Sequence, residues 1–128
     1  MALFESGEMY LETILILSKK GKIVRAIDIG DYMGFSKPSV SRALARLKAD
    51  GYITVHPDEG ISFTEKGRSV AETIYERHNV LSEYLMLIGV GEDTAKEDAC
   101  RIEHVISDES FQAIKSHVQR FSGNLPKA

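Results

Sequence analysis

Residues 34–52, GFSKPSVSRALARLKADGY, constrain the fold of this chain more than any other stretch because they combine a helix stop, a turn and a new helix start. Gly34 is suited to end one helix, and Ser36 and Ser39 are candidate caps for the next, with Pro38 tolerated in its first turn. Apolar side chains then recur at helical spacing, namely Val40, Ala43, Leu44 and Leu47. The stretch therefore predicts two helices joined by a short turn, the second with one buried face.

The other faces of this second helix carry cations and small hydroxyl groups, and no acidic residue interrupts residues 37–48. Such a surface suits a helix in the major groove of double-stranded DNA, where arginine binds guanine edges and serine binds bases or phosphates. A charged helix face is often only solvated, so the pattern alone leaves both interpretations open. The DNA-binding interpretation assigns contacts to Ser36, Lys37, Pro38, Ser39, Ser41, Arg42 and Arg46.

The overall charge confines any nucleic-acid contact to this region. The chain of 128 residues has a net charge of -3, so no polybasic surface attracts DNA as a whole. A hydrophobic content of 43% predicts a globular chain of one or two domains. No apolar run is long enough to span a bilayer, no signal peptide is recognisable, and the single cysteine, Cys100, suits a reducing compartment. We expect a cytoplasmic protein.

The segments around the helix pair predict a winged helix. An amphipathic helix is expected from Ser6 to the glycine stop at Gly21, and a further helix over residues 25–33 precedes Gly34. Two short alternating runs, residues 52–57 and 60–64, predict a β-hairpin. The hairpin tip would lie along the phosphate backbone, but its acids, Asp58 and Glu59, disfavour strong phosphate contacts.

The C-terminal half is predicted to be helical. Thr64 opens a long connecting helix of about residues 65–89, Asp93 and Thr94 cap a helix over 94–106, and Ser107 with Asp108 caps a last helix whose apolar stripe is Phe111, Ile114, Val118 and Phe121. Short helices bury little surface alone, so we infer a dimerisation unit. The expected fold is mainly α, with a winged helix-turn-helix DNA-binding domain over residues 1–70 and a helical metal-binding and dimerisation domain over 71–128.

Several side chains could form a metal site. Cys100, Glu103 and His104 are spaced i, i+3 and i+4 and would share one helical face, and Met9 and Glu12 are spaced i, i+3 on the first helix. Together with a histidine midway along the long helix, His78, this mixture of sulfur, nitrogen and oxygen suits Fe(II), Co(II), Ni(II) or Zn(II), while Mn(II) prefers more oxygen. The same residue types are also common as core or surface residues.

Several sequence blocks in the same order resemble the diphtheria toxin repressor family of metal-dependent transcriptional regulators. They are EMYLETI, SKPSVSRALARLKADGYI, FTEKG, Arg77-His78 and DACRIEHVISDE. The resemblance covers nearly the whole chain and is to the two-domain form, without the SH3-like third domain of longer iron-responsive members. It implies a homodimer that binds a palindromic operator. It also implies a DNA-binding regulator, so we expect no enzyme activity.

The resemblance also implies a ligand set that mixes two branches of the family. Met9, Cys100, Glu103 and His104 match the primary site of the iron-responsive branch, whereas Glu12 matches the manganese-responsive branch; His78 is a ligand position in both. Ser82 stands where the iron branch has a further glutamate. We therefore expect Fe(II), with Mn(II) as the alternative and Co(II), Ni(II) or Zn(II) binding in vitro.

The resemblance further implies that ion binding fixes the N-terminal helix against the dimerisation helices and so permits repression of metal-uptake genes. One alternative is a thiol-based redox sensor using Cys100, for which Lys96 and Arg101 argue weakly and Glu97 argues against. A metal hydrolase lacks a recognisable nucleophile or HExxH motif in this chain. A winged-helix interaction module without an effector is the remaining alternative.

Overall fold

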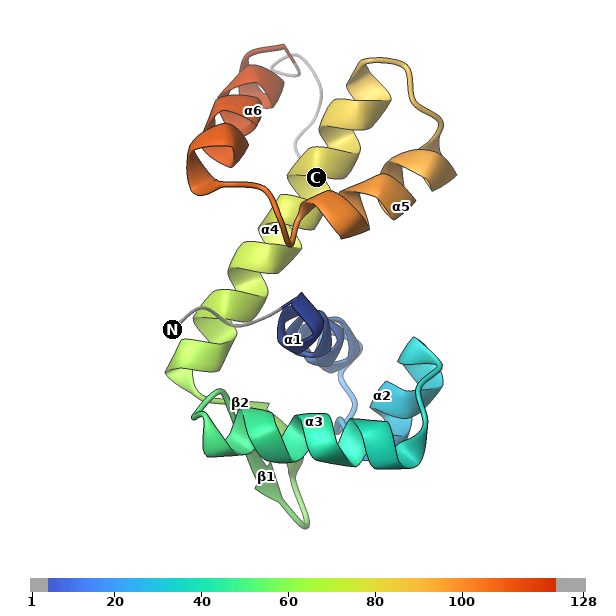
Figure 1. Ribbon diagram of the computed structural model, residues 1–128, viewed down its shortest axis with the longest axis vertical. Coiled ribbons are helices and arrows are strands. Elements are labelled where there is room, and N and C mark those ends of the chain that lie inside the picture. The colour runs from blue at the N-terminus through green and yellow to red at the C-terminus, as the bar shows by residue number, and fades with distance from the viewer. Residues whose placement is uncertain (1–4, 122–128) are drawn as a thin grey trace. The chain divides into compact units, whose positions relative to one another are not determined.

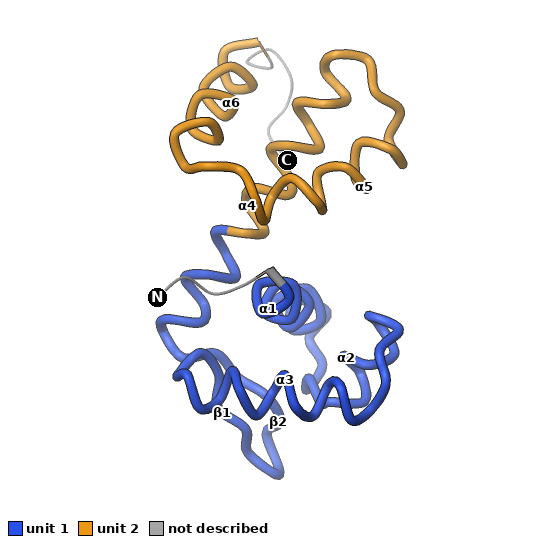
Figure 2. The backbone as a smooth tube through the Cα atoms, viewed as in Figure 1, with its two compact units in different colours: residues 1–73 blue, residues 74–128 orange. Residues whose placement is uncertain are grey.

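The computed structural model describes residues 5–121, which form six helices and one hairpin (Figure 1). In chain order they are α1 (Glu5–Ser18), α2 (Ala26–Met33), α3 (Lys37–Ala49), β1 (Ile53–His56), β2 (Gly60–Phe63), α4 (Glu65–Leu87), α5 (Glu92–Ile102) and α6 (Asp108–Phe121). The chain divides into two compact units, Met1–Thr73 and Ile74–Ala128, and the division falls within α4 (Figure 2). The predicted fold class, mainly helical with a winged helix-turn-helix, is confirmed.

Unit 1 contains the predicted helix pair. Gly34 ends α2 in the left-handed conformation at φ 73°, and its N–H donates to the carbonyl of Gly30 at 2.8 Å. Ser36 is the N-cap of α3, because its hydroxyl oxygen accepts from the N–H of Ser39 at 3.3 Å; Ser39 is therefore the partner of the cap and not a second cap. The core side of α3 is formed by Val40, Leu44 and Leu47, with Ala43 half-buried.

The first helix differs from its predicted one-sided pattern. Six consecutive residues of α1, from Tyr10 to Leu15, are buried, and this run includes the polar Glu12 and Thr13. Leu17, further along the same helix, is only half-buried. The amphipathic interpretation was wrong because α1 packs against both α2 and α3 and is covered on more than one side.

The wing is the predicted antiparallel hairpin, with Ile53 paired to Phe63 and His56 to Gly60. It is attached to the segment before α2, since the N–H of Ile61 donates to the carbonyl of Val24 at 2.9 Å. Gly60 permits this approach because a Cβ on it would collide with that same carbonyl oxygen. These contacts hold the wing beside the helix pair within unit 1 (Figure 1).

The junction of the wing and α4 depends on two residues of the first turn of this helix. The hydroxyl of Thr64 donates to the carbonyl of Gly51 at 2.6 Å and accepts from the N–H of Gly67 at 3.1 Å, which confirms that Thr64 opens α4, as the cap before Glu65. Gly67 lies so close to the main chain that a Cβ on it would overlap the carbonyl oxygen of Tyr52. Glycine is therefore required by close approach at this position.

Unit 2 departs from the sequence prediction at both ends of α5. The helix begins at Glu92 with Gly91 as its N-cap, so Asp93 and Thr94 lie inside the helix and the prediction that they cap it was wrong. The acids of the first turn, Glu92 and Asp93, are favoured there by the positive end of the helix dipole. The helix ends at Ile102, whereas the sequence predicted helix as far as residue 106.

The last helix, α6, is capped by Ser107 as predicted, because the Ser107 hydroxyl accepts from the N–H of Ser110 at 3.1 Å. Asp108 lies inside the first turn, so the prediction that it also caps the helix was wrong. Its predicted apolar stripe is buried at Phe111 and Val118 only. Phe121 is 60% exposed, and its ring packs on that of His117 at a centroid distance of 4.3 Å. Among residues 5–121, no helix has both the length and the apolar character needed to cross a membrane.

Candidate metal centre and nucleic-acid interface

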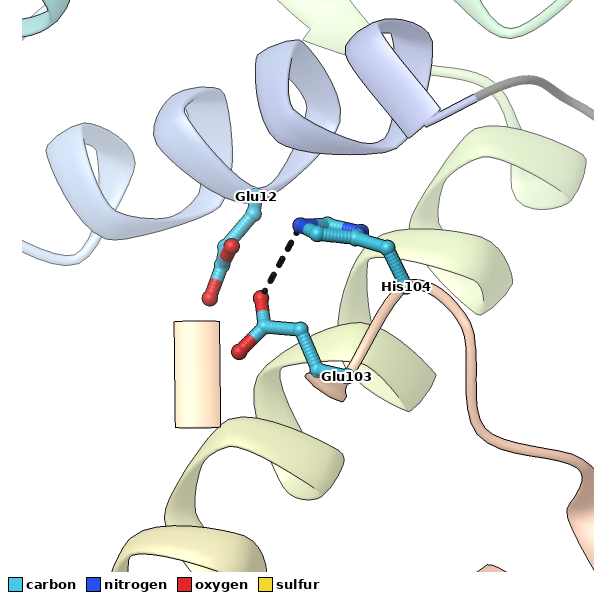
Figure 3. Close-up of side chains that lie close together, drawn as sticks. All are labelled: Glu12, Glu103 and His104. Atoms are coloured by element: carbon cyan, nitrogen blue, oxygen red, sulfur yellow. Dashed lines mark ion pairs between the residues drawn. The ribbon is translucent and has the colours of Figure 1, made fainter. Parts of the chain in front are cut away.

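A fully buried carboxylate lies at the end of α5 in unit 2. Glu103, the C-cap residue of this helix, has no exposed surface. One carboxylate oxygen, Oε1, lies 2.8 Å from Nδ1 of His78 on α4. The other, Oε2, lies 3.4 Å from Nε2 of His104 (Figure 3). A buried carboxylate is costly unless polar groups compensate it, and here an imidazole faces each of its oxygens.

The early end of α5 determines this arrangement. Because the helix stops at Ile102, Glu103 and His104 lie in the turn that follows it. Only Cys100 lies within α5, so the prediction that the three side chains share one helical face was wrong. The imidazole of His104, with its side chain 1% exposed, instead faces the neighbouring carboxylate (Figure 3). Cys100 is half-buried in the last turn of α5, and its role as a ligand stays a prediction.

The donor set in unit 2 fits a first-row divalent cation. Glu103 offers a carboxylate, which such ions bind in its ionised form, and His78 and His104 offer imidazole nitrogens within reach of it. Iron, cobalt, nickel and zinc all accept imidazole and carboxylate, and manganese accepts carboxylate readily. The chemistry of these side chains is therefore compatible with the predicted site.

The remaining predicted ligands belong to α1 in unit 1. Glu12 is buried with 7% of its surface exposed, and Met9, one helical turn earlier, is half-buried. The main-chain carbonyl of Met9 accepts from the hydroxyl of Thr13 at 2.9 Å, and this bond does not involve the thioether sulfur of Met9. Figure 3 also draws Glu12, whose carboxylate is a candidate ligand from α1. The metal roles of both residues stay predictions.

The outer face of α3 is basic, as the sequence indicated. The predicted DNA-binding residues are exposed except for Ser39, which is half-buried, and the set is Ser36, Lys37, Pro38, Ser39, Ser41, Arg42 and Arg46. The tip of the wing, including Asp58 and Glu59, is exposed and acidic. The outer face of α3 is thus cationic, whereas the tip of the hairpin is acidic.

Two of these arginines also border a hollow of about 220 Å³ between α1 and α3. Its lining includes Tyr10, whose pKa is raised by burial, an effect that the nearby Arg42 guanidinium opposes. Arg46 forms an ion pair with Asp50, with Nε and Oδ2 3.9 Å apart. The sequence prediction missed Asp50, although its i, i+4 spacing from Arg46 was a usable signal.

Comparison with known proteins identifies the family. Residues 2–61 match the profile of the iron-dependent repressor N-terminal DNA-binding domain, and residues 64–124 match that of the iron-dependent repressor metal-binding and dimerisation domain. The diphtheria toxin repressor of Corynebacterium glutamicum is 36% identical over 108 residues, which are 84% of this chain and 47% of that protein. The transcriptional regulator MntR of Escherichia coli O157:H7 is 32% identical over 111 residues, covering 87% of this chain and 72% of MntR.

A solved structure supports the same assignment. The structure of the manganese regulator SloR matches all of this chain and 57% of its own, with a TM-score of 0.76 and 26% identity. The present chain spans about half the length of the diphtheria toxin repressor with which it was compared. The two profiles and the MntR relative show that this chain belongs to the iron-dependent repressor family, whose members are metal-dependent, DNA-binding transcriptional regulators and not enzymes.

Proposed function

We propose that this chain is a repressor that binds a palindromic operator as a homodimer when Fe(II) or Mn(II) is bound between its two units. The observation that supports this most strongly is the buried carboxylate of Glu103 with an imidazole at each oxygen, in a chain of this family. Repression of metal-uptake genes would then follow when the ion is abundant. The comparisons give the thiol-sensor alternative no support.

The proposed ligands come from both units. Met9 and Glu12 would be contributed by unit 1, and unit 2 would contribute His78, Cys100, Glu103 and His104. Ligands divided in this way give the ion a higher affinity for the DNA-competent arrangement than for other arrangements, which is the condition for a ligand to shift a conformational equilibrium. When bound, the cation would supply positive charge that compensates the buried carboxylates.

Fe(II) is the proposed physiological ion. The sulfur atoms of Met9 and Cys100 are softer ligands than the carboxylates that manganese prefers, and they favour Fe(II). The buried carboxylate of Glu12 adds oxygen to the set and keeps Mn(II) as the second candidate. Co(II), Ni(II) and Zn(II) should bind in vitro, because nitrogen and sulfur donors generally bind the later first-row ions more tightly.

The proposed DNA contacts are those of α3. Its start is fixed by the Ser36 cap, and its exposed face carries Arg42 on the side away from the buried Val40 and Leu44. A helix held in this way can enter the major groove, and a dimer would place two such helices on half-sites about one helical turn of DNA apart. This two-fold arrangement is the basis for proposing a palindromic operator.

The test is a binding selection from random DNA with the full chain. It is run with Mn(II), with Fe(II) under anaerobic conditions, and with a chelator, and the selected operator is then used to measure affinity. We expect Glu103→Gln and His104→Ala to remove metal-dependent binding while retaining the helical circular dichroism of the wild type. Glu97→Gln, which neutralises an exposed acid on α5, is the matched control and should bind normally. Wild-type affinity of both site variants in the presence of metal would refute the proposal.

A further inference from the structure

We propose that Arg77, which directly precedes His78 on α4, is a positioning residue that holds the turn carrying Glu103 and His104. This inference rests on the proposed metal-binding function. Nη1 of the guanidinium donates to the carbonyl of Glu103 at 3.3 Å and to that of Ile106 at 3.0 Å. The two carbonyls bracket His104, so one side chain anchors both ends of the segment that carries the two ligand candidates.

The guanidinium is held firmly in this position. Its side chain is 15% exposed, its Nη2 lies 3.8 Å from Oδ1 of Asp108 at the start of α6, and its central carbon lies 5.5 Å from the ring centroid of the buried Phe111. A planar guanidinium that is largely buried beside an aromatic ring loses little further freedom when it donates to a carbonyl. Arg77 can therefore act as a rigid support for the turn.

Burying Arg77 lowers the stability of the fold, and packing contacts alone do not explain why an arginine stands at this position. Its Nε is buried without a hydrogen-bond partner among the residues that the structure describes. A buried donor without a hydrogen-bond partner destabilises a fold. An apolar side chain of similar volume would avoid this cost, so a role that requires the guanidinium donors is favoured.

The two adjacent residues of α4 hold different parts of Glu103. Arg77 binds its main-chain carbonyl, and His78 contacts its carboxylate at 2.8 Å. The carbonyls at the end of α5 have no partner within the helix, and a cation is favoured at that negative end of the helix dipole. α4 thereby fixes both the backbone and the carboxylate orientation of the same residue, before any ion binds.

Loss of this support should therefore reduce metal affinity through geometry and not through loss of a ligand. Outer-shell partners of metal ligands typically contribute about 10- to 100-fold to affinity. Removing the guanidinium leaves every proposed ligand in place but allows the turn to move. Ion binding would then have to order the turn, and the loss of conformational entropy would weaken the affinity for the ion. The expected signature is weaker binding together with a changed coordination geometry.

The experiment is a Co(II) titration of the full chain, followed by visible absorption. It compares the wild type with Arg77→Gln and Arg77→Lys, and the matched control is Arg120→Gln, at an exposed arginine of α6. We expect Arg77→Gln to bind about 10- to 100-fold more weakly and with an altered d–d band. Arg77→Lys should recover part of the affinity because an ammonium group can still donate to a carbonyl, and Arg120→Gln should match the wild type. In the metal-free protein, amide hydrogen exchange over residues 103–107 should be faster in Arg77→Gln.

The outcomes separate this inference from the proposed function. If the wild type shows no Co(II) band, the proposed metal site fails. Amide hydrogen exchange of the metal-free protein tests the positioning role independently, and unchanged exchange over residues 103–107 in Arg77→Gln would overturn that role. If the wild type binds Co(II) and Arg77→Gln gives the same affinity and the same band, the positioning role is overturned while the metal site stands. Should Arg77→Gln fail to fold, the same comparison is made with Arg77→Met, which keeps a long side chain without any donor, and wild-type affinity and band in that variant would contradict the inference.

Discussion

The side chain of Glu103 illustrates how much chemistry depends on single residues in this protein. A carboxylate without exposed surface is stable only when neighbouring groups compensate it, and His78 and His104 provide imidazole nitrogens at 2.8 and 3.4 Å. The same geometry that places an imidazole beside each carboxylate oxygen brings two kinds of metal donor together. Burial of this carboxylate lowers the stability of the fold, but it places the carboxylate where it can bind a cation.

At the residue scale, Cys100 should control metal selectivity. We expect Cys100→Glu to strengthen activation by Mn(II) relative to Fe(II), because a carboxylate replaces a softer thiolate. Cys100→Ser is the control, since it removes the thiolate without adding a carboxylate and should weaken Fe(II) binding without a gain for Mn(II). Operator binding titrated with each ion measures the effect, and an unchanged order of the two ions in Cys100→Glu would show that this residue is not a ligand.

The sequence identified Glu103 and His104 through their spacing but could not predict how they meet. Nothing in residues 103–106, EHVI, stops a helix locally, so the pattern indicated helix through the site. The carbonyl of Glu103 is instead bound by Arg77, a residue 26 positions earlier in the chain. Contacts over such a separation are invisible to periodicity, and this is why the ligand geometry required the structure.

At the scale of elements, the helix pair of unit 1 was predictable because its signals are local. Gly34 adopts the left-handed conformation that ends α2, and the Ser36 cap lies three residues before its partner Ser39. The start of α5 was misplaced because Gly91 has no side chain to mark a cap, while Asp93 and Thr94 offered the usual cap chemistry further on. The burial of α1 on more than one side depends on packing against α2 and α3, so it could not be predicted from the sequence of α1 either.

The exposed face of α3 leads to a prediction about DNA sequence preference. If Arg42 binds a base edge, Arg42→Ala should cost about 1 to 3 kcal/mol at one operator position and relax the preference there. Arg68→Ala, which removes an equal charge from the exposed part of α4 in the same unit, is the control for general electrostatic loss. A binding selection distinguishes the cases, and an unchanged preference in Arg42→Ala would indicate a phosphate contact only.

The first turn of α4 leads to a prediction about stability. Gly67→Ala should destabilise unit 1 by about 3 kcal/mol, because the added Cβ overlaps the carbonyl oxygen of Tyr52 and the main chain must move. Urea denaturation measures the free energy of unfolding. Gly91→Ala adds a Cβ in open space and should cost about 1 kcal/mol or less, as expected for a change of cap residue. Equal values for the two variants would contradict the steric explanation.

At the scale of the whole molecule, charge and function are consistent. With a net charge of -3 the chain as a whole does not attract DNA, so the cationic face of α3 is the surface proposed to bind it, and the acidic wing tip limits further phosphate contacts. Non-specific binding to DNA should accordingly be weak and operator binding should depend on the ion. Control of such binding requires a group that acts on both units, and the proposed ligand set, divided between α1 and unit 2, meets this requirement.

The most direct test of this account is anomalous diffraction at the metal edge from crystals grown with Mn(II) and, anaerobically, with Fe(II). The account predicts a strong peak whose ligands include Glu12 from unit 1 together with Glu103 and His104 from unit 2. A peak coordinated by residues of one unit alone, or the absence of a peak at these side chains, would contradict it.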